Sequence, residues 1–220
     1  PGGYVAAIRA SQLGMKVALL EQENLGGVCL NWGCIPTKAL LKTAELYNSL
    51  GHLDDFGISL NSEASIDMKK VIARSRKVAK QLADGVSHLL KKNKITVVKS
   101  RAQLGNKTDG KHVVKTDKDE CLWSPKVIIA TGARPKELPN LQSNGSTILN
   151  YKGALKLDIA PKSITIVGSG AIGMEFASFY NDLGVQVTVI EMLNQILPNE
   201  DLEISNLACS IFENRGIKII

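Results

Sequence analysis

The chain has 220 residues, of which 44% are hydrophobic and 22% are charged, and its formal net charge is +6. This length accommodates one large or two small domains, and the composition is that of an ordinary globular protein. No apolar run reaches the roughly 18 residues of a membrane span, so we expect no membrane association. Four cysteines are too few for a disulfide scaffold.

The first 21 residues predict a helix followed by a strand that ends in Glu21. A shift of 170 residues places Gly3 on Gly173 and Glu21 on Glu191, which indicates an internal repeat. The first copy begins after the point where its own first strand and first two glycines would lie. We therefore expect the sequence to be a fragment in which a glycine directly precedes the first residue.

Two cysteines, Cys29 and Cys34, lie in the segment Leu-Gly-Gly-Val-Cys-Leu-Asn-Trp-Gly-Cys-Ile-Pro-Thr-Lys over residues 25–38. Five residues of regular α-helix rise about 7.5 Å, whereas a disulfide requires Cα atoms within about 7 Å. The pair can therefore close only if the backbone departs from a regular helix. Gly33 gives the chain that freedom, and Pro36 suits the first turn of a following helix. An oxidisable pair in such a chain is more often catalytic than structural.

The region between the two repeats predicts alternating helices and strands. Helical periodicity covers residues 35–49 and 66–93, a strand follows at 95–98, a hairpin at 111–122 and a short buried strand at 127–130. Lysines and arginines crowd residues 69–101; a nucleic-acid surface is one reading, but the solvated face of a long helix is favoured because no aromatic residues interleave the charges. Cys121 and Cys209 have no partner at motif spacing and are expected to be small core residues.

A complete dinucleotide-binding unit follows a turn-rich boundary at residues 139–145. It consists of a strand at 163–167, the run Gly168-Ser-Gly170-Ala-Ile-Gly173, a helix to about residue 183, and a strand at 186–190 that ends in Glu191. The first glycine permits a tight turn, the second lets the backbone approach a pyrophosphate, and the third lets helix and strand pack closely. Glu191 can accept hydrogen bonds from a ribose diol and repels a 2′-phosphate, so the sequence predicts NAD over NADP. A helix at 202–214 and the start of a strand at 217–220 end the chain.

Two nucleotide units that flank a thiol pair suggest electron transfer, and the whole chain resembles the pyridine nucleotide–disulfide oxidoreductases. Within that family the run from Cys29 to Leu41 is most similar to the branch that oxidises dihydrolipoamide, although Trp32 replaces the small apolar residue often found there. The resemblance implies an α/β fold with two Rossmann-like units. It implies an FAD-binding domain over residues 1–145, whose first strand is missing, and an incomplete NAD-binding domain over 146–220.

The resemblance also implies roles for individual residues. Cys34 would exchange electrons with the flavin, and Cys29 would form the mixed disulfide with the substrate. Lys38 would reach the flavin N5 edge and pair with Glu175, although a solvated lysine and a carboxylate that favours a helix dipole are the plainer alternatives. The residues implied to hold FAD are Gly3, Glu21, Gly26, Gly27, Lys38, Ala102, Thr131, Gly132 and Ala133. Those implied to hold the nicotinamide dinucleotide are Gly168, Gly170, Gly173, Glu175 and Glu191.

Three functions remain as hypotheses. The first is FAD- and NAD-dependent oxidation of dihydrolipoamide on the lipoyl domain of a 2-oxoacid dehydrogenase or glycine-cleavage complex, by a homodimer in the bacterial cytoplasm or mitochondrial matrix. The second is a related flavin disulfide reductase that acts on another disulfide or on a metal ion. The third is a non-catalytic dinucleotide-binding module with structural or metal-binding thiols; a metal site is disfavoured because His52, His88 and His112 are scattered. The resemblance places the family's His–Glu base in a dimerisation domain that this sequence lacks.

Overall fold

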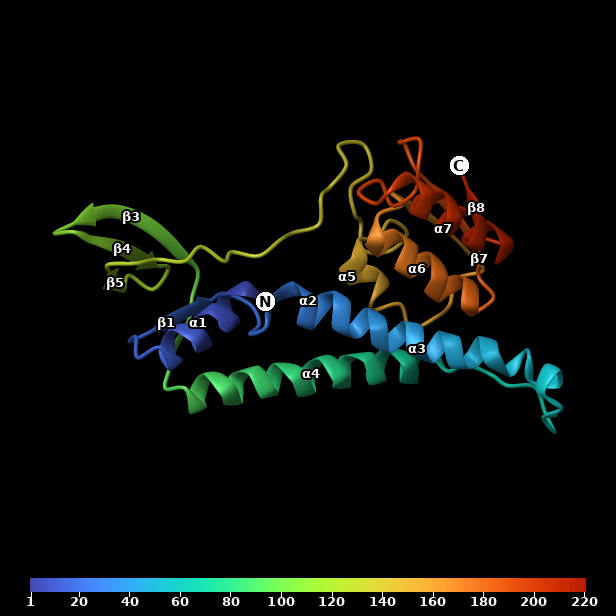
Figure 1. Cartoon of the computed structure of the whole chain (residues 1–220), viewed down its shortest axis with the longest axis horizontal. Coiled ribbons are helices and arrows are strands. Elements are labelled where there is room, and N and C mark those ends of the chain that lie inside the picture. The colour runs from blue at the N-terminus through green and yellow to red at the C-terminus, as the bar shows by residue number, and fades with distance from the viewer. The chain divides into compact units, whose positions relative to one another are not determined.

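A computed structural model describes residues 1–220, which form two compact units. The first unit comprises Pro1–Ile35 and Lys77–Lys136, and the second comprises Pro36–Arg76 and Glu137–Ile220. Figure 1 shows the helices and strands of both units, coloured along the chain. The first unit contains two sheets and the second contains one, and each unit has its own buried side chains.

The first unit is built on a parallel pair of strands and three helices. Strand β1 (Ala18–Glu21) pairs in parallel with β2 (Thr96–Lys99). Helices α1 (Gly2–Gln12), α2 (Gly27–Trp32) and the C-terminal part of α4 (Met68–Lys92) share one apolar core. Its buried members are Ala7, Leu30, Val86, Leu90 and Ile95. This core joins the cysteine-bearing segment to the first nucleotide unit.

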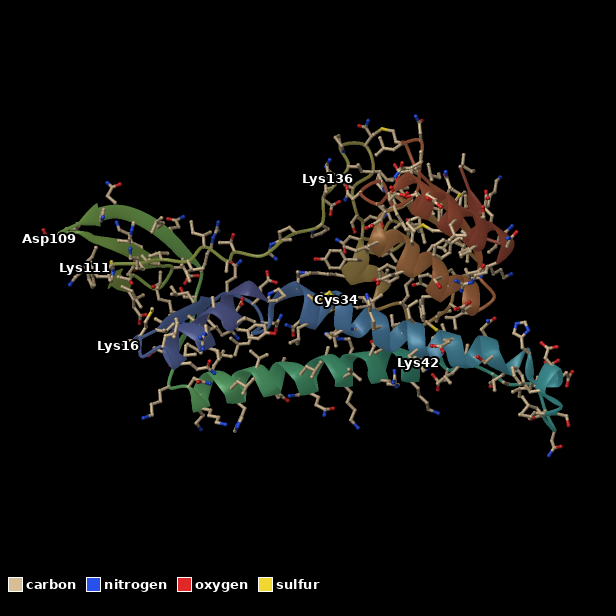
Figure 2. The ribbon with its side chains drawn as sticks, in the orientation of Figure 1. Lys16, Cys34, Lys42, Asp109, Lys111 and Lys136 are labelled. Carbon is tan, nitrogen blue, oxygen red and sulfur yellow. A yellow bond between two sulfur atoms is a disulfide. The ribbon has the colours of Figure 1, made fainter.

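An antiparallel sheet completes the first unit. It consists of β3 (Ala102–Thr108), β4 (Lys111–Thr116) and β5 (Cys121–Ser124), in that order. The predicted hairpin at 111–122 is confirmed as β4–β5. Strand β3 was not predicted from the sequence. Its signal is Asp109-Gly110, a dipeptide that favours two-residue hairpin turns, and Figure 2 shows Asp109 and Lys111 at the tip of the β3–β4 hairpin.

The second unit contains a parallel three-stranded sheet with the order β6 (Ser163–Val167), β7 (Gln186–Ile190) and β8 (Lys218–Ile219). Parallel neighbours require crossover connections, and these run through α6 (Ala171–Asp182) and α7 (Leu202–Asn214). The predicted strand–helix–strand order of the second nucleotide unit is therefore confirmed.

The other helices of the second unit lie mainly in its first segment, Pro36–Arg76. They are α3 (Cys34–Leu50), the 3-10 turn η1 (Leu53–Phe56), the first part of α4, and the single turn α5 (Tyr151–Ala154). The Nη1 atom of Arg74 on α4 donates to the carbonyl oxygen of Ala39 on α3 at 2.8 Å, which ties the two helices together. No helix of the chain is long and apolar enough to cross a membrane.

Helix α6 supplies most of the core of the second unit. Its buried side chains are Met174, Phe176, Ala177, Phe179 and Tyr180. On the neighbouring strand β7, Val187 and Val189 are buried and alternate with less buried residues, which is the pattern of a half-buried strand. The Tyr180 hydroxyl donates to the carbonyl oxygen of Ala154 at 3.3 Å, and burial raises the pKa of Tyr180.

The long helix α4 carries much of the positive charge of the chain. Its buried residues recur every few positions, from Val71 to Leu90, and its lysines are exposed. This is the amphipathic helix with a solvated basic face that the sequence predicts.

Two expectations from the sequence are wrong: a strand at residues 127–130, and core positions for the two cysteines outside the pair. Residues 127–130 do not form a strand, and Ile128 and Ile129 are 69% and 71% exposed. A strand needs a neighbour for its backbone hydrogen bonds, and β1 pairs only with β2. Cys121 lies exposed at the start of the edge strand β5 rather than in the core, and Cys209 is half-buried. The expected domain boundary near residue 145 stays a prediction.

The buried ring of Phe179 generates a stability prediction. Phe179→Ala should lower the free energy of unfolding by about 3–5 kcal/mol, because the side chain is fully buried and its removal leaves a cavity. Urea unfolding followed by circular dichroism measures this change. Leu207→Ala on α7 is the control, since Leu207 is 59% exposed and should tolerate truncation; equal effects of the two variants would contradict the assignment of the core.

Candidate active site

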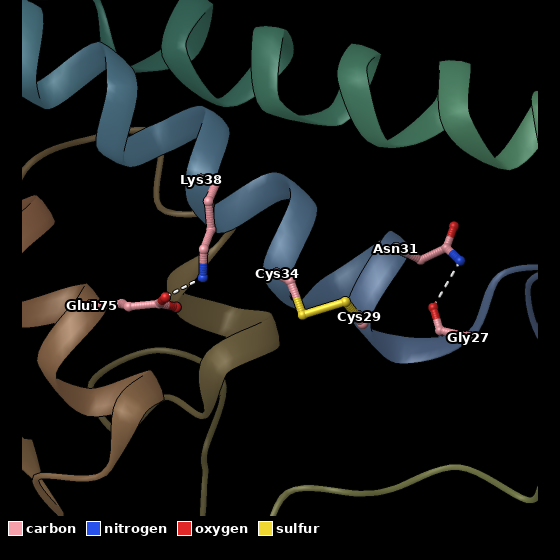
Figure 3. The surroundings of a disulfide bond; sticks show 6 residues. All are labelled: Gly27, Cys29, Asn31, Cys34, Lys38 and Glu175. Atoms are coloured by element: carbon pink, nitrogen blue, oxygen red, sulfur yellow. Dashed lines mark hydrogen bonds and ion pairs between the residues drawn. A yellow bond between two sulfur atoms is a disulfide. The ribbon is translucent and has the colours of Figure 1, made fainter. Parts of the chain in front are cut away.

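Cys29 and Cys34 form a disulfide across the break between two helices (Figure 3). Cys29 lies in α2, and Cys34 is the first residue of α3. Their Cα atoms are 4.8 Å apart, well within the range that a disulfide requires. The predicted departure from a regular helix is confirmed: Gly33, with φ −137° and ψ −119°, separates the two helices.

The break leaves little room for a side chain at position 33. A Cβ atom on Gly33 would lie 3.0 Å from the Cα atom of Cys29 and 3.1 Å from the carbonyl oxygen of Val28. These contacts are tighter than most real Cβ contacts. The glycine therefore allows the two cysteine backbones to approach each other closely.

Asn31 holds the segment that leads into the cysteine pair, and sequence reasoning did not single it out. The side chain is buried, and its Nδ2 atom donates to the carbonyl oxygens of Leu25 and Gly27, both at 2.9 Å (Figure 3). Buried polar groups normally find such partners. The sequence signal for this role was a single asparagine between apolar residues on a helix. The hydrogen bonds of Asn31 hold the Gly26-Gly27 turn before Cys29 in place.

Lys38 and Glu175 form an ion pair, as the sequence analysis expected from the resemblance (Figure 3). Lys38 lies one helical turn after Cys34 on α3, and its Nζ atom binds Oε1 of Glu175 in the first half of α6. The Lys38 side chain is 61% exposed and that of Glu175 is 28% exposed. An ion pair this exposed contributes little to stability, so its effect is to orient two charged side chains.

A hollow of about 320 Å³ opens beside Glu175. Its lining is mainly apolar and includes Leu41 of α3, Met174 of α6, Phe212 of α7, and Leu197 in the segment before α7. Concave apolar surfaces with a few polar groups are typical of cofactor and substrate sites. The carboxylate of Glu175 is the charged group at its edge.

Two glycines of the second nucleotide unit, Gly168 and Gly173, have the backbone roles that the motif predicts, and the approach of a pyrophosphate to Gly170 stays a prediction. Gly168 has a φ of +99°, which suits a tight turn that other residues rarely adopt. A Cβ atom on Gly173 would lie 2.1 Å from the carbonyl oxygen of Gly168, so only glycine lets α6 approach β6 this closely. A Cβ atom on Gly170 would meet nothing within 4 Å, which leaves open space where a pyrophosphate would approach the backbone.

Glu191 lies directly after β7 and is held by three hydrogen bonds. Its Oε2 atom accepts from the Ser169 hydroxyl at 2.7 Å and from the Ser169 backbone N–H at 2.9 Å. Its Oε1 atom accepts from the Leu193 N–H at 3.0 Å. These bonds, above all the one from the Ser169 hydroxyl, lower the pKa of Glu191 to about 2. The carboxylate is therefore ionised at neutral pH and oriented toward the motif glycines.

The residues implied to hold FAD lie on the first unit. Gly3 lies in α1, where a Cβ atom would meet the Ala130 side chain at 3.4 Å, directly before Thr131, Gly132 and Ala133. Glu21 ends β1 and accepts from the Glu23 N–H at 2.8 Å. Gly26 and Gly27, with φ of 93° and 73°, begin α2, and Ala102 begins β3. The structure thus brings Gly3 next to the Ala-Thr-Gly segment.

Arg134 forms an ion pair with Glu23 that the sequence analysis missed. The pair joins the segment after Ala-Thr-Gly to the residues that follow β1, across 111 positions of sequence. No local pattern signals a contact over that separation. It brings two segments implied to contact FAD together within the first unit.

The geometry fits two dinucleotide cofactors. On the second unit, the open space at Gly170 and the hydrogen-bonded carboxylate of Glu191 are compatible with the nicotinamide dinucleotide that the motif predicts. On the first unit, Glu21 and the Gly26-Gly27 turn are the groups expected to bind FAD from the resemblance. No three His, Cys, Asp or Glu side chains of the chain are grouped so that they could hold a metal ion.

Comparisons with known proteins identify close relatives. The chain is 49% identical to a dihydrolipoyl dehydrogenase of Rhizobium etli and 44% identical to one of Bacillus subtilis, in each case over 100% of this chain and 48% of the relative. The chain therefore spans about half the length of these curated relatives.

Solved structures agree with the sequence comparisons. The crystal structure of LpdA from Mycobacterium tuberculosis matches with a TM-score of 0.87 at 25% identity, over 99% of this chain and 48% of that one. The HOCl-induced flavoprotein disulfide reductase RclA from Escherichia coli matches with a TM-score of 0.79 at 30% identity, over 99% of this chain and 46% of that one. The α/β fold expected from the sequence is thus confirmed.

The contrast between two motif glycines can be tested by mutation. Gly173→Ala should lower the free energy of unfolding by about 1–3 kcal/mol, because the new methyl group collides with the backbone of Gly168. Gly170→Ala should keep the stability of the wild type, since its methyl group meets no protein atom, and should weaken dinucleotide binding. Urea unfolding and calorimetric titration with NAD measure the two effects. A Gly173→Ala variant as stable as the wild type would refute the close approach of α6 and β6.

The held carboxylate of Glu191 predicts a dependence of stability on pH. Because its pKa falls from 4.5 to about 2 on folding, its stabilisation is fully present above pH 4.5 and is lost as the pH falls toward 2. The difference in unfolding free energy between the wild type and Glu191→Gln should therefore be constant from about pH 8 to 5 and should shrink below that range. Urea unfolding at a series of pH values measures the difference, and one that grows on acidification would contradict the prediction.

The family of the chain follows from a sequence comparison that agrees with the disulfide and with the relatives described above. A sequence model described as pyridine nucleotide-disulphide oxidoreductase matches residues 1–220, the whole of the chain. The disulfide that such proteins are named for is present between Cys29 and Cys34. The chain belongs to the pyridine nucleotide–disulfide oxidoreductase family.

Proposed function

We propose that the intact protein is an FAD- and NAD-dependent dihydrolipoyl dehydrogenase. It passes electrons from dihydrolipoamide through the Cys29–Cys34 disulfide to FAD and then to NAD. The observation that carries this proposal is the disulfide at the start of α3, with Lys38 one turn further along and ion-paired to Glu175. The relatives with 44% and 49% identity support dihydrolipoamide as the substrate.

The cysteine pair accepts electrons by thiol–disulfide exchange. A thiolate of dihydrolipoamide attacks the Sγ atom of Cys29, which forms a mixed disulfide and releases Cys34 as a thiolate. The second substrate thiolate then closes the lipoyl disulfide and releases Cys29 as a thiolate. Two electrons move from the substrate to the protein pair, and the two thiol protons of the substrate are released.

Lys38 and Glu175 provide the charges around this pair. A cation near a group that gains negative charge stabilises that charge, and Lys38 follows Cys34 by one turn on the same helix. Glu175 holds the lysine ammonium group through the ion pair and adds a carboxylate beside the apolar hollow. FAD, when bound, would supply a two-electron acceptor, and NAD would accept a hydride.

The residues for each cofactor follow the two units. Glu21 would bind the adenosine ribose of FAD, and Gly26 and Gly27 would offer backbone N–H groups to its pyrophosphate. Further FAD contacts would come from Gly3, Lys38, Ala102, Thr131, Gly132 and Ala133. NAD would lie against Gly168, Gly170 and Gly173, with Glu191 on its ribose and Glu175 near its nicotinamide ring.

The partner would be the lipoyl domain of a 2-oxoacid dehydrogenase or glycine-cleavage complex, because such domains carry the dithiol that the reaction consumes. The protein would act as a homodimer in the bacterial cytoplasm or the mitochondrial matrix. The bacterial dihydrolipoyl dehydrogenases among its relatives support this assignment.

A second candidate is a flavin disulfide reductase with another substrate. The likeness to RclA favours it, because one structure of that reductase is a Cu(II) complex and matches this chain with a TM-score of 0.80 at 28% identity. The higher identity to dihydrolipoyl dehydrogenases ranks dihydrolipoamide first. Assays of the intact protein with dihydrolipoamide and with Cu(II) separate the two candidates.

The roles of the two cysteines can be separated in the full-length protein. Cys29→Ser and Cys34→Ser should each abolish reduction of NAD by dihydrolipoamide, because either change removes one half of the disulfide. Only Cys34→Ser should also remove the broad long-wavelength absorption that a dithiol produces when a thiolate lies against the flavin. Cys121→Ser is the matched control, since Cys121 is exposed and unpaired, and it should leave both signals unchanged.

Two outcomes would overturn this proposal. A colourless intact protein that cannot be reconstituted with FAD would exclude both flavin-dependent candidates. Loss of the long-wavelength absorption in Cys29→Ser, with retention in Cys34→Ser, would reverse the two roles.

A further inference from the structure

Ser169, the second residue of the motif Gly168-Ser-Gly170, is fully buried and makes three hydrogen bonds to two partners. Its hydroxyl and its backbone N–H both donate to Oε2 of Glu191, at 2.7 and 2.9 Å. Its carbonyl oxygen accepts from the Leu197 N–H at 3.0 Å. One residue therefore fixes both the carboxylate after β7 and the loop that follows it.

The hydrogen bonds to the Glu191 carboxylate leave part of its acceptor capacity available. Both donors from Ser169 share Oε2, and the Leu193 N–H donates to Oε1. The backbone of Met192 also interacts favourably with the carboxylate. A carboxylate oxygen accepts more than one hydrogen bond, so Oε1 has capacity for one further donor. The orientation of this oxygen is set from the opposite side, by Ser169.

We infer that Ser169 is a positioning residue that makes Glu191 selective for a dinucleotide with a free adenosine 2′-hydroxyl. This inference rests on the proposed binding of NAD at the second unit. A ribose hydroxyl donates to Oε1, while a 2′-phosphate meets a carboxylate that cannot swing away because its Oε2 atom is anchored twice. The motif assigns no side-chain role to this position, since only its glycines are required for the fold.

The chemistry of the anchor explains why a serine is effective here. A neutral hydroxyl donates to the carboxylate without cancelling its charge, whereas a lysine or arginine would pair with it and reduce the repulsion of a phosphate. The same hydrogen bond is the largest of the contacts that lower the pKa of Glu191. The serine thus sets the position of the carboxylate without reducing its negative charge.

Removal of the hydroxyl tests the inference in the full-length holoenzyme. Ser169→Ala should raise the dissociation constant for ADP-ribose and the KM for NAD by about tenfold, since a hydrogen bond to a charged group contributes about 1.5 kcal/mol. The kcat at saturating NAD should stay unchanged, and the ratio of NAD to NADP affinity should fall. Calorimetric titration with ADP-ribose, NAD and NADP measures the affinities. Ser205→Ala is the matched control, because Ser205 is equally buried and hydrogen-bonds to Leu197 and Gln195 but not to Glu191.

A double-mutant cycle distinguishes positioning from a general structural effect. If Ser169 acts through Glu191, Ser169→Ala should change the ADP-ribose affinity of the Glu191→Gln variant far less than that of the wild type. An equal change in both backgrounds, or none in either, would overturn the inference. If Ser169→Ala fails to fold, Ser169→Gly removes the same hydroxyl and is subject to the same criteria.

Different experimental results would refute the proposed function. A wild-type holoenzyme that binds neither NAD nor ADP-ribose would refute the NAD site itself. Reduction of the flavin by dihydrolipoamide needs no nicotinamide and tests the thiol half separately. A wild type that binds NAD, together with an unaltered Ser169→Ala variant, would refute only the role of Ser169.

Discussion

The backbone turns at Gly33 between α2 and α3, and the placement of the reactive groups depends on that turn. It brings the Cα atoms of Cys29 and Cys34 to 4.8 Å, which a continuous helix would not allow. It also begins α3 at Cys34, so that Lys38 follows one turn later on the same helix. One glycine thus sets both the approach of the two thiols and the residue at which α3 begins.

The second unit organises its charged groups around α6 in a similar way. The residues before this helix hold Glu191 through Ser169, and its first half carries Glu175, the partner of Lys38. The helix can serve both groups only because Gly173 lets it pack directly against the turn at Gly168. A single close contact therefore supports the nucleotide loop and the carboxylate beside the apolar hollow.

The helices and strands that the sequence predicted correctly are those with a strong local pattern of apolar residues. Helices α3, α4, α6 and α7 and strands β6 and β7 have periodic apolar residues and clear ends, and their boundaries were predicted within a few residues. Strand β3 is polar and mostly exposed, so only the Asp109-Gly110 turn could have revealed it. The apolar run at 127–130 had a strong strand signal, but composition does not reveal whether a neighbouring strand is present to pair with it.

The candidate site also combines features that are visible in local sequence with contacts that are not. The sequence by itself determined which chemical groups are available: two thiols five positions apart, the spaced glycines, and an acidic residue at the end of a strand. These are local patterns, because only a few positions of sequence separate the residues concerned. The pairing of Lys38 with Glu175 across 137 positions was expected only from the family resemblance and not from any local pattern. The tertiary structure alone decided that Arg134 meets Glu23 and that Ser169 holds Glu191. Such contacts depend on how distant segments pack, because a side chain finds its partner only when the fold brings the two within hydrogen-bonding distance.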